Sequence, residues 1–480
     1  MQVLILIRLA SELTLKSSRT RSSFTRRLVQ NIKDCLESAG IKHRVTVEWG
    51  RAYVRADSPA AVAALTRVFG ISSVSRVEEV VAAALDTIVE RGLELFRDRV
   101  RGKRFAVRAR RAGEHTFRSK DVEIKLGAAL LPFSAGVDLT NPEVVAHVEI
   151  RQKQAYLFSS RAEANGGLPL GVEGRALTLI SGGYDSAVAS WLLLKRGVEQ
   201  DYVFCNLGGE AYERAVVQVA KVLADEWSYG TRPRLHVVDF GPPLDELKAK
   251  VRQNYWQVVL KRLMYRAASS IGSTTGAQVI ITGEAIGQVS SQTLSNLTAI
   301  EPATDLPVFR PLVGFDKEEI IAHARAIGTA ALSEQVKEYC AIAPGHPVTG
   351  TTAERAAAEE AKMDPAVLER AIAGAKTLDL RALTPTDLVA PYLFTDTIPD
   401  GAVVFDCRPE PQYEAWHLPG AIHRDEWELL RDFRRLDKNR TYVLYCAHGM
   451  QTAYLAEKMQ NAGFEAYSFR GGVRELKKRA

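Results

Sequence analysis

The residues best suited to chemistry form one short stretch, Ser181-Gly182-Gly183-Tyr184-Asp185-Ser186. The apolar run 176–180 precedes this stretch, and the helix-like apolar run 187–194 follows it. This order predicts a strand, a tight loop rich in glycine and hydroxyl groups, and then the start of a helix. Free backbone N–H groups and the helix dipole at such a turn collect a phosphate anion. Because the lysine of a Walker A loop is missing, a different kind of phosphate site is predicted.

Cys446 is the second candidate for chemistry. It directly follows the apolar run 442–445, and a glycine-containing loop and a helix-like stretch come after it. Converging N–H dipoles at a helix start favour a thiolate or persulfide, whereas a cysteine in mid-strand serves as apolar filling. Cys340 lies 106 positions earlier, and the sequence alone does not show that the two sulfurs meet. A persulfide that gives up its sulfur needs a resolving thiol if it is to close a disulfide.

Two further stretches have the composition of a nucleotide site. Residues 282–293 follow a predicted strand, and their glycines, amides and hydroxyls suit close contact with phosphate or ribose. Asp316 and Glu319 form a capping box, which predicts a helix start. Lys317 lies in this first turn, where acids are favoured by about 0.3–1 kcal/mol. Since a residue that breaks a local rule is a candidate for function, Lys317 is interpreted as a phosphate or adenylate contact.

Composition narrows the class of protein. The chain has 480 residues, enough for about three domains, and five cysteines without a C-x-x-C pair, which argues against a zinc or iron–sulfur site. It contains no apolar run of the roughly 18 residues that a membrane span needs, so a cytoplasmic protein is expected. The net charge is +6, and ten basic residues lie between positions 97 and 120. Such a concentration is typical of a nucleic-acid binder, although a solvated basic face has the same composition.

Hydrophobic periodicity predicts an α/β chain with several units. The first 75 residues show a β-α-β-α-β order, and strands around shorter helices follow up to about residue 165. A glycine-rich boundary is expected at 163–174, and a proline-containing linker at 382–401. Between them, apolar strands alternate with helical stretches, which predicts a mostly parallel sheet covered on both faces. Residues 353–380 are expected to be helical, and the tail repeats the strand–helix rhythm.

Together these motifs resemble one family, the tRNA 4-thiouridine synthetases or tRNA sulfurtransferases, in the long form that carries a rhodanese domain. The S-G-G-x-D-S loop resembles the PP-loop of ATP pyrophosphatases, and the segments around Phe105–Arg111 and Asp121–Lys125 resemble a THUMP domain. Residues 405–408, 417–421 and the loop of Cys446 resemble a rhodanese domain, without the arginine often found after its cysteine. The implied domains are ferredoxin-like (1–75), THUMP (76–165), doubly wound PP-loop (172–385) and rhodanese (400–480).

The resemblance also implies a role for individual residues. Those that would contact ATP, bound with Mg²⁺, are Leu179, Ile180, Ser181, Gly182, Gly183, Asp185, Ser186, Lys261, Gly283 and Gln292. Asp185 and Lys317 would also be catalytic in adenylation. Those expected to bind tRNA are Arg104, Arg108, Arg110, Arg111, Arg118 and Lys120. Cys446 would carry a persulfide and Cys340 would resolve it as a disulfide. No metal ligand is assigned.

The implied reaction adenylates O4 of uridine 8 in tRNA and replaces that oxygen with sulfur. The implied partners are tRNA, a cysteine desulfurase, a disulfide reductant, and a small sulfur-carrier protein that supplies the thiazole of thiamine. Three alternatives remain open at this point: a thiolase acting at C2 of a pyrimidine, an RNA-binding chaperone with a vestigial ATP site, and a stand-alone sulfur carrier. The basic N-terminal half and the intact loop 181–186 count against the first two.

Overall fold

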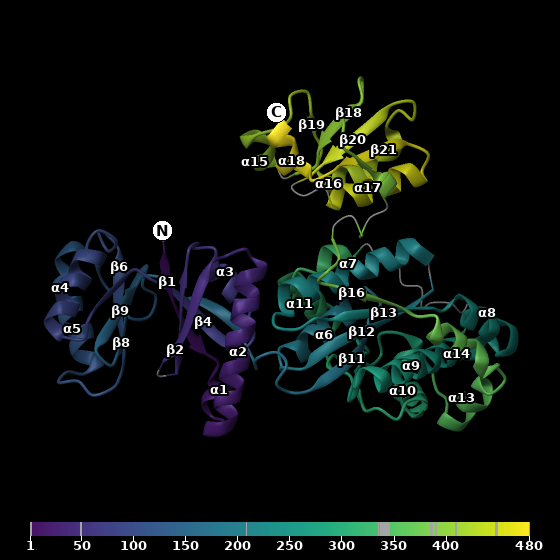
Figure 1. Ribbon diagram of the computed structural model, residues 1–480, viewed down its shortest axis with the longest axis horizontal. Coiled ribbons are helices and arrows are strands. Elements are labelled where there is room, and N and C mark those ends of the chain that lie inside the picture. The colour runs from purple at the N-terminus through teal and green to yellow at the C-terminus, as the bar shows by residue number, and fades with distance from the viewer. Residues whose placement is uncertain are drawn as a thin grey trace. The chain divides into compact units, whose positions relative to one another are not determined.

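The computed structural model describes the chain except residues 1, 49, 208, 335, 337–345, 385, 386, 389, 390, 409, 447–449 and 480. The chain divides into two compact units, Met1–Arg381 and Ala382–Ala480 (Figure 1). The first unit contains three sheets and the second contains one. Within the described ranges, no helix is both long and apolar enough to cross a membrane. The expected multidomain α/β architecture is confirmed.

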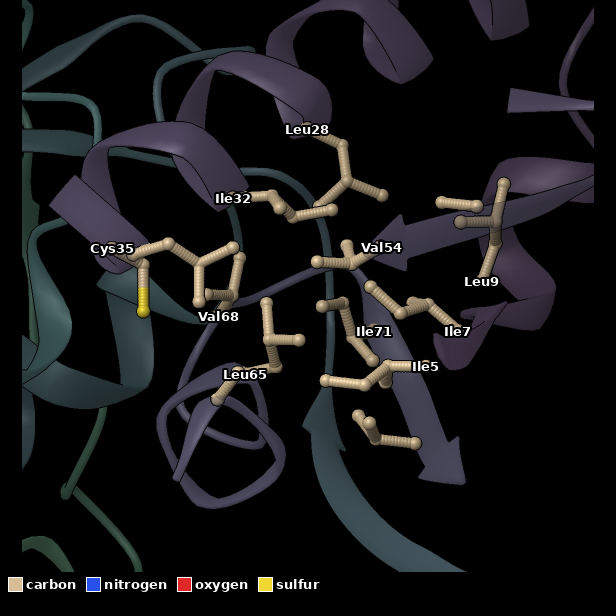
Figure 2. Close-up of a cluster of buried hydrophobic side chains, with 14 of the residues drawn as sticks. Ile5, Ile7, Leu9, Leu28, Ile32, Cys35, Val54, Leu65, Val68 and Ile71 are labelled. Carbon is tan, nitrogen blue, oxygen red and sulfur yellow. The ribbon is translucent and has the colours of Figure 1, made fainter. Parts of the chain in front are cut away.

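The first sheet is antiparallel and has the strand order β10-β4-β1-β3-β2. Its strands are β1 (Val3–Leu9), β2 (His43–Glu48), β3 (Arg51–Ala56), β4 (Ile71–Val77) and β10 (Ala162–Gly166). Helices α1 (Ser11–Thr14), α2 (Ser18–Ser38) and α3 (Ala61–Leu65) accompany it. Ser17 caps α2 by accepting a hydrogen bond from the N–H of Thr20. The predicted apolar stripe of α2, which includes Leu28 and Ile32, packs against the strands (Figure 2).

The second sheet has the order β5-β9-β8-β6-β7. Its strands are β5 (Glu79–Ala82), β6 (Arg104–Ala112), β7 (Gly136–Val137), β8 (Val144–Arg151) and β9 (Gln154–Phe158). Helices α4 (Leu85–Phe96) and α5 (Ser119–Leu130) and the 3₁₀ turn η1 (Leu131–Phe133) complete this part. A buried carboxylate links it to the first sheet. Glu149 accepts hydrogen bonds from Nε of Arg8 at 2.9 Å and of Arg51 at 2.7 Å. Burial opposes its ionisation, but these arginines lower the pKa of Glu149 to about 2.

The third sheet has the order β15-β14-β11-β12-β13-β16 and is parallel except for β16. Its strands are β11 (Arg175–Leu179), β12 (Glu199–Asn206), β13 (Arg234–Asp239), β14 (Val279–Ile281), β15 (Val308–Phe309) and β16 (Lys376–Asp379). Its longer helices are α6 (Tyr184–Leu194), α7 (Gly209–Trp227), α8 (Gly241–Lys250), α9 (Trp256–Thr275), α10 (Leu294–Ile300), α11 (Lys317–Ile327), α13 (Ala353–Glu360) and α14 (Pro365–Ala373). Short turns are η2 (Gln253–Tyr255), η3 (Ser290–Gln292), η4 (Glu301–Ala303) and α12 (Ala330–Ser333).

The order of these strands reverses at β11, because β12 and β13 extend the sheet on one side and β14 and β15 on the other. In an open parallel sheet, such a switch point leaves a crevice at the carboxyl ends of the strands. The predicted phosphate loop follows β11 directly and therefore lies at this crevice.

Two expectations about the organisation of this unit are wrong. The stretch 353–380 is not helical throughout, since its end forms β16, which pairs antiparallel with β13. The boundary stretch 163–174 contains most of β10, which returns to pair with β4 in the first sheet. In both places a short segment becomes a strand because a distant edge strand supplies hydrogen bonds.

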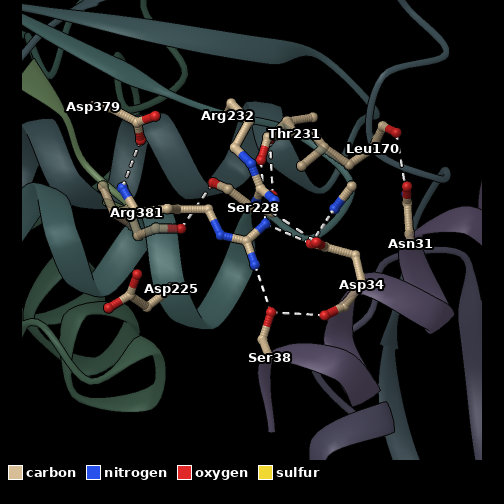
Figure 3. A network of polar contacts seen from close by, with 12 residues as sticks. Asn31, Asp34, Ser38, Leu170, Asp225, Ser228, Thr231, Arg232, Asp379 and Arg381 are labelled. Atoms are coloured by element: carbon tan, nitrogen blue, oxygen red, sulfur yellow. Dashed lines mark hydrogen bonds and ion pairs between the residues drawn. The ribbon is translucent and has the colours of Figure 1, made fainter. Parts of the chain in front are cut away.

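A polar network connects helix α2 to residues that flank the strands of the third sheet (Figure 3). Asp34 accepts a hydrogen bond from the N–H of Gly230 at 2.8 Å and forms an ion pair with Arg381. Arg27 donates to the carbonyl oxygens of Leu170 and Gly230 at 2.8 and 2.9 Å. Charge-assisted bonds of this kind connect the part with the first sheet to the part with the third sheet, within one compact unit.

The second unit is a parallel sheet with the order β17-β21-β20-β18-β19. Its strands are β17 (Phe394–Thr395), β18 (Val403–Asp406), β19 (Ile422–His423), β20 (Thr441–Tyr445) and β21 (Glu465–Phe469). Its helices are α15 (Glu410–Ala415), α16 (Glu426–Asp432), α17 (Met450–Asn461) and α18 (Gly472–Arg479), with short turns η5 (Pro391–Leu393) and η6 (Phe433–Arg435). Two apolar clusters, centred on Leu444 and Val443, fill the two faces of the sheet.

Candidate functional site

The loop after β11 has the backbone of a phosphate cradle. Gly182 has φ +79°, and a Cβ there would also lie 3.0 Å from Val216, so this position requires glycine. The hydroxyl of Ser186 accepts a hydrogen bond from the N–H of Ser181 at 3.2 Å. The same hydroxyl donates to the carbonyl oxygen of Gly183 at 3.3 Å. These bonds hold the loop at the N-terminus of α6, as the sequence predicts.

Gly283 allows the segment after β14 to approach this loop. A Cβ at Gly283 would lie 2.5 Å from the carbonyl carbon of Asp185 and from the nitrogen of Ser186. Real Cβ atoms do not come so close to backbone, so a side chain at this position displaces the loop. Packing therefore requires a glycine at position 283. The sequence interpretation, that the glycines of 282–293 allow close backbone approach, has its physical reason in this contact.

A pocket opens at the switch point of the third sheet. It is lined by nine of the ten residues assigned to ATP: Leu179, Ile180, Ser181, Gly183, Asp185, Ser186, Lys261, Gly283 and Gln292. The tenth, Gly182, shapes the loop as described above. Phe204, Cys205 and Tyr212 contribute an apolar part of the wall. Side chains from four segments, far apart in sequence, thus meet in one concave site.

Asp185 and Lys317 form an ion pair. The ammonium nitrogen of Lys317 lies 2.8 and 3.1 Å from the two carboxylate oxygens of Asp185, and 5.7 Å from the ring centre of Tyr184. Lys317 is the first residue of α11, and the capping box of Asp316 and Glu319 is present as predicted. The lysine that breaks the helix-start rule therefore has a carboxylate partner at the phosphate loop. The pair brings a cation to the place where an anionic ligand would bind.

A buried charge network forms the floor of the pocket. Glu284 is 2% exposed, and its Oε2 accepts hydrogen bonds from the hydroxyl groups of Tyr265 and Thr282 and from Arg310. Lys261 lies 3.9 Å from Oε1. Burial alone would raise the pKa of Glu284, but Lys261, Tyr265 and Arg310 hold it below its usual value. The sequence interpretation assigned no role to Glu284, Tyr265 or Arg310; the available signal was an acid, Glu284, three positions after the apolar strand 279–281.

Cys446 lies in the second unit, immediately after β20. It is buried, with 3% of its surface exposed, and the hydroxyl group of Thr452 donates to its sulfur at 3.6 Å. Thr452 stands in the first turn of α17 and also contacts the hydroxyl group of Ser468 at 2.7 Å. The strand–cysteine–helix order is therefore present as predicted. Residues 447–449 of its loop lie outside the described residues.

The two other cysteines considered in the sequence analysis are Cys340 and Cys407. Cys340 falls in 337–345, outside the described residues, so its distance from Cys446 is not part of the described structure. Cys407 is buried in an apolar cluster of the second unit and its N–H donates to the carbonyl oxygen of Tyr445 at 2.9 Å. This placement agrees with the interpretation of Cys407 as structural.

The six basic residues assigned to RNA lie on β6, at the residue before α5 (Arg118) and in α5 (Lys120). Five are exposed, namely Arg104, Arg108, Arg110, Arg118 and Lys120, and Arg111 is half-buried. Arg104, Arg108 and Arg110 alternate along β6, and so they share one face of the second sheet. Odd-numbered residues of β6, such as Phe105 and Val107, face the apolar core instead. Three residues of the basic run thus form a stripe on one face of β6.

Sequence reasoning missed two arginines from outside the basic run, Arg8 and Arg161, whose charges act on this part of the second sheet. Four arginines act on the imidazole of His147, which stands on β8 opposite Arg108: Arg8, Arg108, Arg110 and Arg161. Burial and then these arginines lower the pKa of His147 to about 4. The ring of His147 stacks on Phe158 at 5.0 Å between centres. Arg8 lies in β1 and Arg161 lies between β9 and β10, so the fold and not the dense basic run brings them near His147.

Four known family models match separate parts of the chain and together cover most of it. The profile described as thiamine biosynthesis protein (ThiI) matches residues 171–364, and that of the rhodanese-like domain matches 391–479. The ThiI ferredoxin-like domain matches 4–75 and the THUMP domain matches 82–160. The PP-loop pocket and Cys446 therefore fall in two separately matched regions.

Individual proteins are similar over nearly the full chain. A tRNA sulfurtransferase from Desulfurococcus amylolyticus is 40% identical, covering 98% of this chain and 97% of its own length. One from Pectobacterium atrosepticum is 37% identical, covering 96% and 98%. A crystal structure of a 4-thiouridine synthetase–RNA complex with bound ATP has a TM-score of 0.69 and 33% identity. That comparison covers 79% of this chain and 99% of the solved one.

Proposed function

Because the chain belongs to the tRNA sulfurtransferase family, we propose that it transfers sulfur to C4 of uridine 8 in tRNA at the expense of ATP. The full-length similarity to tRNA sulfurtransferases carries this proposal. The pocket at the switch point of the third sheet supports it, because Lys261 and a glycine-rich loop line it and Asp185 of that loop pairs with Lys317. The arginine stripe on β6 supports an RNA substrate.

In the first step, O4 of the uridine attacks the α-phosphorus of ATP. A bond forms between O4 and phosphorus, the bond to the β-phosphate oxygen breaks, and diphosphate leaves with the electron pair. The N–H groups of the loop 181–183 and the dipole of α6 stabilise the diphosphate. Lys317, held by Asp185, supplies positive charge beside the same loop. Mg²⁺ would enter with ATP and would supply further positive charge to its phosphates, with Asp185 as the carboxylate of the loop that lines the pocket.

In the second step, Cys446 acts as the sulfur donor. Its persulfide, loaded by a cysteine desulfurase, attacks C4 through the terminal sulfur, and AMP leaves. The thiolate of Cys340 then attacks the sulfur of Cys446, which forms a Cys340–Cys446 disulfide and releases 4-thiouridine. An external dithiol reduces this disulfide by two electrons and restores both thiols. The position of Cys446 after β20, ahead of α17, supports its role as nucleophile.

A second outlet for the sulfur of Cys446 is transfer to a small sulfur-carrier protein for the thiazole of thiamine. The description of the matched family as thiamine biosynthesis protein favours this additional role. This transfer would use the thiol of Cys446 and the hydroxyl group of Thr452, which both lie in the second unit.

The deciding experiment incubates unmodified tRNA with the full-length protein, ATP–Mg²⁺, cysteine, a cysteine desulfurase and a dithiol reductant. Mass spectrometry of the digested nucleosides is expected to show 4-thiouridine at position 8 and one AMP per sulfur. Sulfur at C2 would identify a different thiolase. Absence of any thionucleoside, with the persulfide loaded on Cys446, would contradict the proposal.

A further inference from the structure

Glu284 has a geometry that the proposed reaction does not yet use. Its two carboxylate oxygens face different parts of the protein. Oε2 accepts three hydrogen bonds, from the hydroxyl groups of Tyr265 at 2.6 Å and Thr282 at 3.0 Å, and from Nε of Arg310 at 3.0 Å. Oε1 faces Lys261, whose ammonium nitrogen lies 3.9 Å away. The three bonds to Oε2 fix the plane of the carboxylate, and so they fix where Oε1 stands.

Lys261 is the member of this network that reaches the pocket. Its side chain is 23% exposed, whereas that of Glu284 is 3% exposed, and both line the pocket. A lysine ammonium sits on a long flexible stem, and ordering that stem costs conformational entropy when a phosphate binds. A fixed carboxylate beside the ammonium orders it before the ligand arrives.

The charges of the network support a specific pairing of Glu284 with Lys261. Arg310 contacts Glu284 but also forms an ion pair with Glu301 at 2.5 Å. Glu301 is therefore a second carboxylate for the guanidinium. Glu284 is the carboxylate that both Lys261 and Arg310 contact. If its charge were removed, no negative charge would stand between these two cations. Their repulsion in this poorly solvated site would turn the mobile lysine away.

We propose that Glu284 is a positioning residue, which holds Lys261 in the orientation that binds ATP. This inference rests on the proposed function, because it takes ATP as the ligand of the pocket. The bonds to Oε2 of Glu284 come from Tyr265, Thr282 and Arg310, so its carboxylate acts on the ligand through Lys261. It connects the end of β14, and through Arg310 the end of β15, to a side chain of α9. The ATP site is thereby tied to the rigid sheet.

The test measures ATP affinity by calorimetry in the full-length protein. Glu284→Gln keeps the size of the side chain and removes its charge, and we expect ATP affinity about tenfold weaker. Glu301→Gln is the matched control, because it also removes a carboxylate from Arg310 and leaves Oε1 of Glu284 beside Lys261. It is expected to bind ATP within about twofold of the wild type. The affinity for tRNA is expected to stay unchanged in both variants.

A double-mutant cycle separates positioning from a structural effect. In a Lys261→Met background, Glu284→Gln is expected to change ATP affinity by less than about twofold, because its effect acts through the lysine. An equal tenfold loss in that background, or wild-type affinity in the single variant, would overturn the inference. If Glu284→Gln lowers the melting temperature too far, Glu284→Asp serves, since it keeps the charge and withdraws Oε1 by one methylene. A wild-type protein that binds no ATP would instead overturn the proposed function.

Discussion

The loop 180–183 of the first unit and the loop 446–449 of the second both connect a parallel strand to a helix, but they have different proposed ligands, a phosphate group and a persulfide sulfur. Four residues, 180–183, separate β11 from α6, and four residues, 446–449, separate β20 from α17. Both follow a buried parallel strand and precede a helix, so both lie in the field of a helix N-terminus. The first loop opens with apolar Ile180 and a hydroxyl, whereas the second opens with the sulfur of Cys446.

This difference shows how one plan serves two kinds of ligand. A phosphate is not covalently bound, so its site needs backbone N–H groups within hydrogen-bond distance and positive charges from other elements. Lys317 of α11 and Lys261 of α9 supply these charges. In the proposed reaction, the persulfide is instead bound covalently to Cys446, directly after β20. Its described support is local, a hydroxyl from Thr452 in the first turn of α17. The phosphate site therefore depends on tertiary contacts more than the sulfur site does.

The largest effect is expected from the nucleophile. Cys446→Ser should abolish 4-thiouridine formation, because a hydroxyl cannot carry the transferable sulfur, while ATP affinity stays at the wild-type value. Nucleoside mass spectrometry and calorimetry measure the two quantities. Cys407→Ala is the matched control, a buried cysteine at the neighbouring strand end, and should retain sulfur transfer. Thiolation by the Cys446→Ser protein at the wild-type rate would show that the sulfur site lies elsewhere.

The ion pair at the phosphate loop should come next. We expect Asp185→Asn and Lys317→Met each to slow AMP formation by about 10²–10³-fold. Lys317→Met removes the cation beside the phosphate loop, and Asp185→Asn removes the carboxylate that holds this cation in place. Loading of the persulfide on Cys446 should be unaffected, which a mass shift on the peptide reports. Lys362→Met removes a comparable pair, with Glu359 at 2.7 Å, and should leave AMP formation unchanged. An equal loss in that control would mean a general effect of charge.

Gly283→Ala is expected to have an intermediate effect. The new methyl group meets the backbone of Asp185 and Ser186, and such overpacking costs about 1–3 kcal/mol. ATP affinity should fall through displacement of the loop, with persulfide loading intact. Gly314→Ala is the control, because its added Cβ meets nothing within 4 Å. A Gly283→Ala protein with wild-type ATP affinity would show that the loop can shift without cost.

The smallest effect should come from Thr452→Val, which removes the hydroxyl donor to the sulfur of Cys446. The loss of one such hydrogen bond is about 0.5–1.5 kcal/mol, so persulfide transfer should slow by a few-fold. Stopped-time alkylation of the persulfide measures that rate. Thr441→Val, at an exposed site in the same unit, should leave it unchanged. A hundredfold loss in Thr452→Val would mean that the sulfur site depends on precise polar contacts as much as the phosphate site does.

Much of the local structure could be predicted from sequence patterns. The strand–loop–helix order at Ser181 and at Cys446, and the capping box before Lys317, follow from residue types within a few positions of each other. The strands β10 and β16 were missed because each takes its conformation from a partner strand far away in the chain. The network around Glu284 was missed for the same reason, since its members come from separate elements.

By itself, the sequence determined which chemical groups the protein has and the local backbone that presents them: a glycine-rich loop for phosphate, a cysteine after a strand, and a run of arginines. Only the tertiary structure decided which of these groups meet. Lys317 reaches Asp185 across 132 positions, and Glu284 meets Lys261 because β14 and α9 pack together. The physical reason is one of range. Capping and periodicity act over a few residues, whereas contacts between side chains depend on strand order and packing, which the whole chain sets.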